Sequence, residues 1–347
     1  MPAPIPSSFR GIFRDDDASR AVYSEAAGIG QVIPRAVAVP ADADDVVTLM
    51  RWAASESVPL IPRGSGSSMA GGAIGDGVIV DLSRLTWLDD VDVAHRTVRC
   101  GAGVLRNTID AAARAAGLTF PVDPSSGAYC TVGGMSSTNS AGAHTLRYGS
   151  MRPWVEALDC VFTDGSRAEV RRGAPAPDVE PVRRLLAAAT ELIAAERLAP
   201  SRHAGVRKES SGYGLADYAD SGELVDLLVG SEGTLVLVVG LEVRLAPLFP
   251  ATASVLGAFA SLDDAVAAAV SAREAGASAC ELLDRTFLDV ARNGGAHVPV
   301  GADVEAVLLA EVEGESADAC RARANVLSVT FRGAGASDVV LALAPAD

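Results

Sequence analysis

Three short segments rich in glycine, serine and threonine contain the residues of this chain that are best suited to binding chemistry. They are PRGSGSSMAGG at Pro62–Gly72, TVGGMSSTNSAG at Thr131–Gly142 and GSEGTL at Gly230–Leu235. Glycine permits positive φ angles and close approach of the backbone to a ligand, and successive backbone N–H groups with nearby hydroxyls can bind an anion. The first segment is therefore either a cradle for a diphosphate group or an exposed surface loop.

The second and third segments favour the cradle. Long polar segments inside an apolar domain are uncommon as idle connections and are often functional. Strand-like runs stand beside these segments, among them VIVDL at Val78–Leu82 and VLVVGLEVRL after Thr234-Leu235. We therefore expect the three segments to enclose one large cofactor that carries phosphate groups.

Other cofactor patterns are missing from the sequence. It contains no G-x-x-x-x-G-K-[ST], no H-E-x-x-H and no G-x-S-x-G. Gly64-Ser65-Gly66 and Gly101-Ala102-Gly103 begin like dinucleotide fingerprints but lack the third glycine, so a nicotinamide site has little support.

Composition limits the partners. The 347 residues include 29 basic and 44 acidic side chains, for a net charge of −15. A nucleic-acid-binding protein needs a basic face, and anionic membranes repel such a chain, so neither is an expected partner. A small anionic substrate remains compatible, because a few buried cations can dominate locally. The length favours two domains or one large domain with an appendage, and the 49% hydrophobic content is enough for packed cores.

Targeting signals and cysteine usage point to the cytoplasm. The N-terminus has no cationic start followed by an apolar stretch, and no apolar run reaches the ~20 residues of a spanning helix. The five cysteines are widely spaced without a C-x-x-C pair, which argues against a disulfide framework, a zinc ribbon or an iron–sulfur cluster in this chain. We predict reduced, mostly buried thiols and no metal ligands.

The elements that must position the three segments alternate between helix and strand. A helix is predicted at Asp42–Ser57, capped by the Asp42 carboxylate and ended by Pro59, and another at Leu105–Ala116, ended by Gly117 in the left-handed conformation. Asp164-Gly165 predicts a β-hairpin. Further strands are expected at Val78–Leu82 and Thr97–Gly101, and a further helix at Glu180–Glu196.

A second domain is predicted after a linker at Pro247–Pro250. Strand, helix and strand follow each other twice, at Val255–Phe259, Leu262–Ala275 and Ala279–Leu283, and then at Val304–Val312, Ser316–Thr330 and Val339–Leu343. A short helix is expected around Phe287. This double β-α-β pattern is typical of a ferredoxin-like α+β sheet.

Taken together and in order, these segments resemble the vanillyl-alcohol-oxidase/PCMH superfamily of FAD-binding dehydrogenases and oxidases. The resemblance is strongest to the branch of glycolate oxidase FAD subunits, D-lactate dehydrogenases and D-2-hydroxyglutarate dehydrogenases. It is carried by PLIPRGSGSSMAGG with VIVDLSRL, PVDPSS, TVGGMSSTNSAG, LRYGSMRPWVEALDCVFTDG, RKESSGYGL and GSEGTLVLVVGLEVRL, and it spans about Pro34 to Asp284.

The resemblance implies an α+β fold, with a PCMH-type FAD-binding domain of two α/β subdomains followed by part of a ferredoxin-like substrate (cap) domain. The expected boundaries are an N-terminal extension at 1–33, the FAD-binding domain at 34–246 and the C-terminal FAD-linked oxidase domain at 251–347. Relatives of this branch continue beyond the position of Asp347, into histidine- and acid-containing motifs. We therefore expect a complete FAD domain with an incomplete cap, as a fragment, a trimmed chain or a shorter subunit.

The resemblance also implies which residues hold FAD. The diphosphate would be held by Pro62, Arg63, Gly64, Ser65, Gly66, Ser67, Ser68 and Gly71. The flavin and its ribityl chain would be lined by Pro124, Ser125, Ser126, Val132, Gly133, Gly134, Ser137, Asn139 and Ala141. The adenine-side wall would be formed by Glu232 and Gly233. Because backbone amides do much of this binding, bulkier residues at Gly64, Gly66 or Gly134 should harm binding more than serine-to-alanine changes. Covalently flavinylated relatives have a histidine where this chain has Ser67, so non-covalent FAD is expected.

Catalytic residues are less well marked. His144 directly follows the flavin-lining run and could approach the flavin, although a loop histidine bonded to backbone is the alternative. Arg207 and Lys208 form a cationic cluster with His203 that could bind a substrate carboxylate or lie on a solvated face. No residue qualifies as the general base.

The implied reaction is hydride transfer from a small 2-hydroxy acid to flavin N5. An electron acceptor, such as an iron–sulfur partner, would lie outside this chain, and the protein could meet a membrane peripherally through that partner. The alternatives are a FAD-binding subunit or fragment without activity of its own, and a FAD-free enzyme of the transcarbamylase-like or UDP-sugar type. A flavin spectrum and its bleaching by substrate separate these three.

Overall fold

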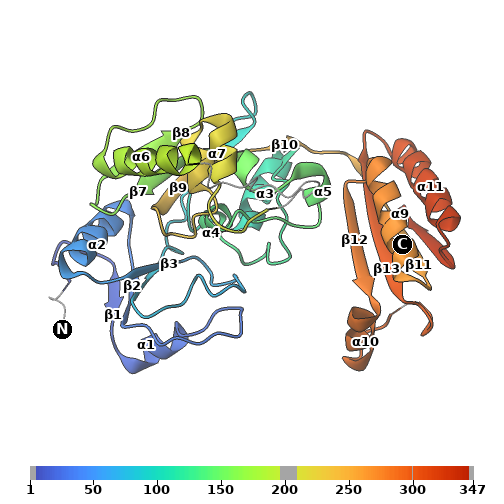
Figure 1. Ribbon diagram of the computed structural model, residues 1–347, viewed down its shortest axis with the longest axis horizontal. Helices are drawn as coiled ribbons and strands as arrows, with labels where there is room; N and C mark the ends of the chain where they lie inside the picture. Colours follow the sequence, from blue (N-terminus) through green and yellow to red (C-terminus); the bar gives the residue numbers. More distant parts are fainter. Residues whose placement is uncertain (1–4, 196–208, 299, 344–347) are drawn as a thin grey trace. The chain divides into compact units, whose positions relative to one another are not determined.

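A computed structural model describes residues 5–195, 209–298 and 300–343 of the chain (Figure 1). The chain forms two compact units. The large unit comprises Met1–Ala141 and Ser150–Ala246, and the small unit comprises Gly142–Gly149 and Pro247–Asp347. The small unit is therefore built from two stretches that are far apart in the sequence.

The first sheet of the large unit carries the loop of the first glycine-rich segment. Its strand order is β1 (Ile12–Arg14), β2 (Ala36–Val39), β4 (Val78–Asp81) and β3 (Leu60–Arg63), with β1 antiparallel to β2 and the other pairs parallel. Helix α2 (Ala43–Glu56) packs its buried Leu49 and Trp52 into this core. Its N-cap is Asp42, which accepts hydrogen bonds from the amides of Asp44 and Asp45, as predicted.

The second sheet of the large unit is antiparallel. Its order is β5 (Thr97–Gly101), β9 (Leu237–Arg244), β7 (Val155–Val161) and β8 (Arg167–Arg171). The β7–β8 connection is the predicted hairpin, with Gly165 at φ 77°. Helices α3 (Arg106–Ala115) and α6 (Glu180–Ala194) contribute to the core of this subdomain, together with Phe120 and Phe162. The two α/β subdomains expected from the resemblance are confirmed.

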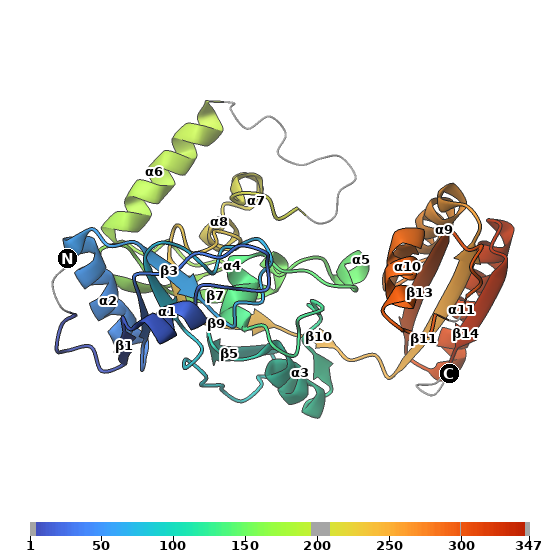
Figure 2. The ribbon, with the colours of Figure 1, turned by 90° about the horizontal axis from the view of Figure 1, so that it is seen from below.

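The small unit is a βαββαβ fold. Four antiparallel strands lie in the order β12 (Ala279–Asp284), β13 (Ala306–Gly314), β11 (Ala251–Phe259) and β14 (Asp338–Ala342). Helices α9 (Leu262–Glu274) and α11 (Ala317–Gly333) share one core with alternate residues of β11 and β13, so they cover the same face of the sheet (Figure 2). Phe259 and Phe331 meet edge to face in this core, with ring centroids 6.0 Å apart. The ferredoxin-like prediction is confirmed.

The sequence did not reveal the shortest elements. The segment at Thr131–Gly142 was expected as a loop but contains helix α4 (Val132–Ser137). The N-terminal extension supplies β1 and α1 (Asp17–Val22). Helix α10 (Arg285–Asn293), in contrast, is the short helix that was expected around Phe287. The remaining short elements are α5 (Thr145–Tyr148), the 3-10 turn Arg152–Trp154, α7 (Leu215–Ser221), α8 (Leu224–Leu228), β6 (Leu118–Thr119) and β10 (Ala246–Pro247). Most of them are too short for their apolar periodicity to be read.

The five cysteines are unpaired, and all except Cys280 are buried. Burial raises the pKa of Cys100 to about 12 and that of Cys280 to about 11, so these thiols stay protonated and act as small apolar groups. This agrees with the expectation from the sequence. Within the described ranges, no helix has the length and apolar character needed to cross a bilayer.

One buried carboxylate ties α3 to the strand that follows it. Asp110 accepts hydrogen bonds from Arg114 Nε at 2.8 Å, Thr119 Oγ1 at 2.8 Å and the Phe120 amide at 3.0 Å. Burial by itself raises the pKa of Asp110, but these bonds and the charge of Arg106 outweigh it, so the pKa lies below its usual value of 3.8.

We therefore expect Asp110→Asn to lower the free energy of unfolding by about 3 kcal/mol at neutral pH, because several donors lose their charged acceptor. A lowered folded-state pKa contributes stability that is present above the unfolded pKa and is lost as the pH falls through the folded value. Urea unfolding should show the gap between wild type and variant shrinking below about pH 4. A gap that stays constant with pH would contradict this assignment.

Candidate cofactor site

The three small-residue segments meet around one cavity in the large unit. Its volume is about 400 Å³, which lies in the range of about 300–1,000 Å³ that is common for small-molecule sites. Its walls come from the loop between β3 and β4, from α4 and the residues after it, and from the segment that leads into β9. The expected convergence of these segments is therefore present in the structure.

The first wall is a run of backbone amides without partners. None of the N–H groups from Gly64 to Met69 donates a hydrogen bond to any residue that the structure describes. The hydroxyls of Ser65 and Ser67 lie beside this run, 3.3 Å apart. Such unpaired amides are costly unless a ligand or water accepts from them, and a successive run of them is suited to an anion such as a diphosphate.

The loop that holds these amides is braced against the N-terminal extension by Arg63. Arg63 Nη1 donates to the carbonyl oxygens of Glu25 and Ala73, at 2.8 and 3.2 Å, and its guanidinium stacks over the Tyr23 ring at 5.2 Å. The Tyr23 hydroxyl in turn donates to Asp81 Oδ2 at 2.5 Å. Burial, strengthened by this bond to Asp81, raises the pKa of Tyr23 to about 12. The N-terminal extension thus supports the first wall.

Two glycines allow α4 and its N-cap to be approached closely, by the first wall at Gly64 and by Ala102 at Gly133. A Cβ on Gly64 would lie 2.1 Å from Thr131 Oγ1, and a Cβ on Gly133 would lie 2.6 Å from the Ala102 side chain. Thr131 is the N-cap of α4, with its hydroxyl accepting from the Gly134 amide at 3.3 Å. Any side chain at Gly64 would therefore displace the loop from the helix.

The second wall turns at Asn139. This residue is 1% exposed and has a left-handed φ of 45°. Its Oδ1 accepts from the Arg152 amide at 2.9 Å, and its Nδ2 donates to the Glu209 carbonyl at 3.2 Å. The side chain of Asn139 thereby fixes the backbone on both sides of the wall.

The third wall is hydrogen bonded to the second. The Gly230 amide donates to the Ser136 carbonyl at 3.0 Å, and the Glu232 amide donates to the Ser137 carbonyl at 2.9 Å. Beyond Glu232 the wall becomes apolar, with Val236 and Val238 facing the cavity. One end of the cavity can therefore receive an anion, and the other can receive an apolar ring.

Most of the residues that the resemblance assigned to FAD line this cavity. They are Pro62, Arg63, Gly64, Ser65, Gly66, Ser67, Ser68, Ser126, Gly133, Gly134, Ser137, Asn139, Ala141, Glu232 and Gly233. Gly71, Pro124, Ser125 and Val132 are not among the lining residues. Val132 is fully buried in the core behind α4.

Sequence reasoning missed other lining residues. They are Met69, Gly72, Ala73, Leu82, Ala102, Cys130, Thr131, Met135, Thr138, Ser140, Ser210, Val236 and Val238. The alternation along β9 could have identified its two valines, because residues at i and i+2 of a strand face the same side. Leu82 and Ala102 reach the cavity only through tertiary packing and carry no local signal.

None of the catalytic candidates is among the lining residues that the structure describes. His144 belongs to the small unit, where its Nε2 lies 2.7 Å from Glu311 Oε1. Together with Glu313 it places one nitrogen and two carboxylates within 4.8 Å of one another, but Arg147 Nε lies 3.5 Å from Glu313 Oε2 and already offsets its charge. We therefore do not assign a metal site to these three side chains. Arg207 and Lys208, with His203, lie outside the described residues.

The cavity fits FAD by its chemistry. Its run of unpaired amides and serine hydroxyls suits the diphosphate, and the apolar surfaces of Leu82, Met135 and the β9 valines suit flat rings. A nicotinamide dinucleotide would share the diphosphate but would normally bind at the G-x-G-x-x-G turn of a parallel βαβ unit, which the sequence lacks.

Comparison with known proteins agrees with this fit. A model of the FAD binding domain matches residues 34–171, and a model of the C-terminal domain of FAD linked oxidases matches residues 249–347. The chain resembles the structure of an alkyldihydroxyacetonephosphate synthase with a TM-score of 0.67 and 18% identity, covering 96% of this chain and 58% of that one. This second likeness supports the fold alone.

Several relatives of known activity are similar in sequence. D-lactate dehydrogenase of Archaeoglobus fulgidus is 30% identical over 80% of this chain and 55% of its own length. D-2-hydroxyglutarate dehydrogenase of Pseudomonas putida is 33% identical over 70% of this chain and 25% of its own length. Glycolate oxidase subunit GlcD of Bacillus subtilis is 29% identical over 87% of this chain and 56% of its own length. The chain thus spans about half the length of two of these relatives and a quarter of the third.

The two domain matches, the relatives and the fold lead to the same conclusion. The chain belongs to the PCMH-type FAD-linked oxidases, and FAD is its cofactor.

Proposed function

We propose that FAD binds non-covalently in the cavity of the large unit, with its diphosphate on the amides from Gly64 to Met69. The run of unpaired N–H groups is the observation that carries this proposal, because diphosphate oxygens are the acceptors such a run lacks. The side chain at the position of the flavin-linking histidine of some relatives is Ser67, whose hydroxyl forms no stable bond to a flavin.

The other two walls would hold the remaining parts of FAD. The residues around Ser137–Ala141 would lie along the isoalloxazine and ribityl chain, and Glu232 and Gly233 with β9 would line the adenine side. Gly71, Pro124, Ser125 and Val132 stay predictions at the margin of this site.

We infer that the flavin oxidises a small 2-hydroxy acid. FAD supplies the hydride acceptor when bound, and the protein binds and orients it. The support is that the similar proteins include a D-lactate dehydrogenase, a D-2-hydroxyglutarate dehydrogenase and a glycolate oxidase subunit. Arg207 and Lys208 stay candidates for binding the substrate carboxylate, and His144 stays a candidate near the reaction.

Electrons must then leave the reduced flavin for an acceptor. The sequence has no clustered cysteines for an iron–sulfur centre, so we propose an acceptor outside these 347 residues, with an iron–sulfur centre as one class. The unpaired, buried cysteines support operation in a reducing compartment.

The test is anaerobic bleaching of the purified protein. Visible flavin absorbance should appear on the protein and pass fully to the supernatant after acid denaturation. D-lactate, glycolate or D-2-hydroxyglutarate should bleach it, while L-lactate serves as the control of opposite configuration. Yellow colour that stays on the denatured chain would contradict non-covalent binding. A flavin that none of the three acids bleaches would mark the chain as a FAD-binding part without activity of its own.

A further inference from the structure

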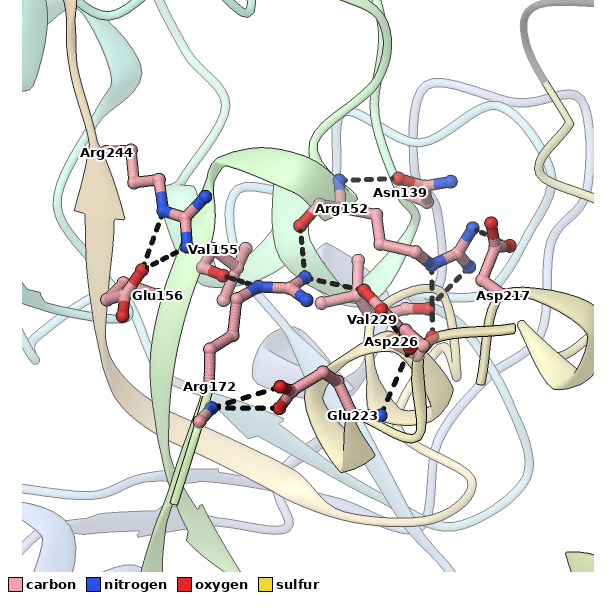
Figure 3. A network of polar contacts seen from close by, with 12 residues as sticks. Asn139, Arg152, Val155, Glu156, Arg172, Asp217, Glu223, Asp226, Val229 and Arg244 are labelled. Carbon is pink, nitrogen blue, oxygen red and sulfur yellow. Dashed lines mark hydrogen bonds and ion pairs between the residues drawn. The ribbon is translucent and has the colours of Figure 1, made fainter. Parts of the chain in front are cut away.

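A buried arginine outside the cavity joins two of its walls. Arg152, in the turn before β7, is 9% exposed. Its Nε donates to the Asp226 carbonyl at 3.0 Å, its Nη2 to the Val229 carbonyl at 2.9 Å and its Nη1 to Asp217 Oδ2 at 2.8 Å (Figure 3). All three nitrogens of the guanidinium therefore donate hydrogen bonds, and the acceptors lie on α7, on α8 and on Val229, the residue after α8.

The backbone around Arg152 leaves room for it. A Cβ on Gly214 would lie 2.7 Å from Arg152 Nη2, and a Cβ on Gly230, which has φ 88°, would lie 3.3 Å from the same nitrogen. Two glycines thus stand where a side chain would push the guanidinium away. The guanidinium therefore packs closely against the backbone at both glycines.

Arg152 reaches the cavity through its neighbours on both sides. Its own amide donates to the side chain of Asn139, which lines the second wall. Its guanidinium holds the Val229 carbonyl, and the next residue, Gly230, opens the third wall by donating to Ser136. Arg152 is therefore hydrogen bonded to a residue of the second wall and to the residue that precedes the third wall, and it does not line the cavity itself.

We propose that Arg152 is a positioning residue for FAD, which holds the wall at Asn139 and the wall at Gly230–Gly233 at the spacing that the cofactor requires. This inference rests on the proposed binding of FAD in this cavity. Pre-organised walls bind more tightly because no ordering cost is left at the moment of binding. The structural observation behind it is that one buried residue binds Asn139 through its backbone amide and the Val229 carbonyl through its guanidinium.

Arg172 offers a matched control. It is partly buried in the same network and donates to Asp226 Oδ1 at 2.5 Å, to the Arg152 carbonyl at 2.9 Å and to the Val155 carbonyl at 2.7 Å (Figure 3). It contacts neither Asn139 nor the Val229–Gly230 peptide. Loss of Arg172 removes a cation from the Asp226 carboxylate and a donor from the Arg152 carbonyl, and it leaves the partners of the Arg152 guanidinium in place, so it reports the effect of the network on stability.

The experiment measures two quantities for Arg152→Met, Arg152→Lys and Arg172→Met in the full chain. These are the dissociation constant of FAD added to the apoprotein and the urea midpoint of that apoprotein. We expect Arg152→Met to raise the dissociation constant about 30-fold and Arg152→Lys about 10-fold, while Arg172→Met changes it less than about 3-fold for a similar loss of stability. The visible circular dichroism of bound FAD should change in Arg152→Lys and stay as in wild type in Arg172→Met.

Each outcome decides the matter. If FAD affinity follows the urea midpoint equally in the Arg152 and Arg172 variants, Arg152 is only structural and the inference is overturned. If Arg152→Met does not fold, the lysine variant, which keeps the charge but not the fork, decides alone. Wild-type protein that binds no FAD overturns the proposed function and this inference with it. Wild type that binds FAD while both Arg152 variants bind it equally well overturns only the inference.

Discussion

Gly64→Ala is expected to raise the dissociation constant of FAD by about 10- to 100-fold, because an overpacked contact costs about 1–3 kcal/mol and about 1.4 kcal/mol is a factor of ten in affinity. The new Cβ would lie 2.1 Å from Thr131 Oγ1. Thr131 cannot turn away freely, since its hydroxyl caps α4. The loop must move instead, and it carries the unpaired amides of the first wall. Titration of the apoprotein with FAD measures the change.

A second substitution at Thr131 separates this mechanism from general damage. Gly64→Ala combined with Thr131→Ala removes the clashing oxygen and should recover part of the affinity, whereas Thr131→Ser keeps the oxygen and should recover none. Ser67→Ala is the matched control in the same loop and should change the affinity by less than about 3-fold, the cost of one modest hydrogen bond. An unchanged affinity in Gly64→Ala would place the diphosphate elsewhere.

The structure also ranks the glycines that the sequence treated alike. A Cβ on Gly134 would meet Thr131 Oγ1 at 3.1 Å, against 2.1 Å for Gly64, and a Cβ on Gly66 would meet the Arg63 guanidinium at 2.5 Å. We therefore expect alanine at Gly64 to be more harmful than alanine at Gly134. The expectation that both exceed serine-to-alanine changes stays a prediction.

Arg63→Met is expected to weaken FAD binding about 100-fold, through two losses. The loop loses the bonds to the Glu25 and Ala73 carbonyls, each of which is charge-assisted and contributes about 1.5–3 kcal/mol. The site also loses a cation beside an expected diphosphate, so the salt dependence of binding should become weaker than in wild type. FAD titrations at low and high salt measure both effects.

Two further variants locate the contribution of Arg63. Arg63→Lys keeps the charge but lacks the planar fork, so its affinity should fall between wild type and the methionine variant. Tyr23→Phe removes the bond to Asp81 but keeps the ring under the guanidinium, and it should change FAD affinity by less than about 3-fold. If Arg63→Met binds FAD as wild type does, the brace has no part in binding.

The glycine-rich segments were identifiable from the sequence because their chemistry is local. Gly64, Gly133 and Gly233 stand in runs of small residues between predicted strands, and these runs mark turns and ligand loops wherever they occur. The ferredoxin-like unit was identifiable for a different reason. Its helices and strands are long enough for their periodicity to appear, and their βαββαβ order specifies the sheet.

What remained hidden depends on contacts between distant residues. Arg152 and Asp217 are 65 residues apart, and Tyr23 and Asp81 are 58 apart, so no local pattern links either pair. Helix α4 was missed because its two glycines and two serines lower its helix propensity. Its formation relies on the Thr131 cap and on burial of Val132 and Met135.

The separate stretch Gly142–Gly149 has a consequence for anyone who divides this protein. It belongs to the small unit, where Tyr148 donates to Glu313 and Arg147 stacks on Phe249 at 4.4 Å. A single proteolytic nick at Pro247–Pro250 would therefore leave one piece of this domain attached to each product, and the products should stay together until denatured. A gene that ends after Ala246 would encode Gly142–Gly149 without strand β13, to which Tyr148 is hydrogen bonded. Each unit of this chain is compact but is built from two separate stretches of sequence. Isolating one unit therefore requires joining both of its stretches rather than cutting the chain at one point.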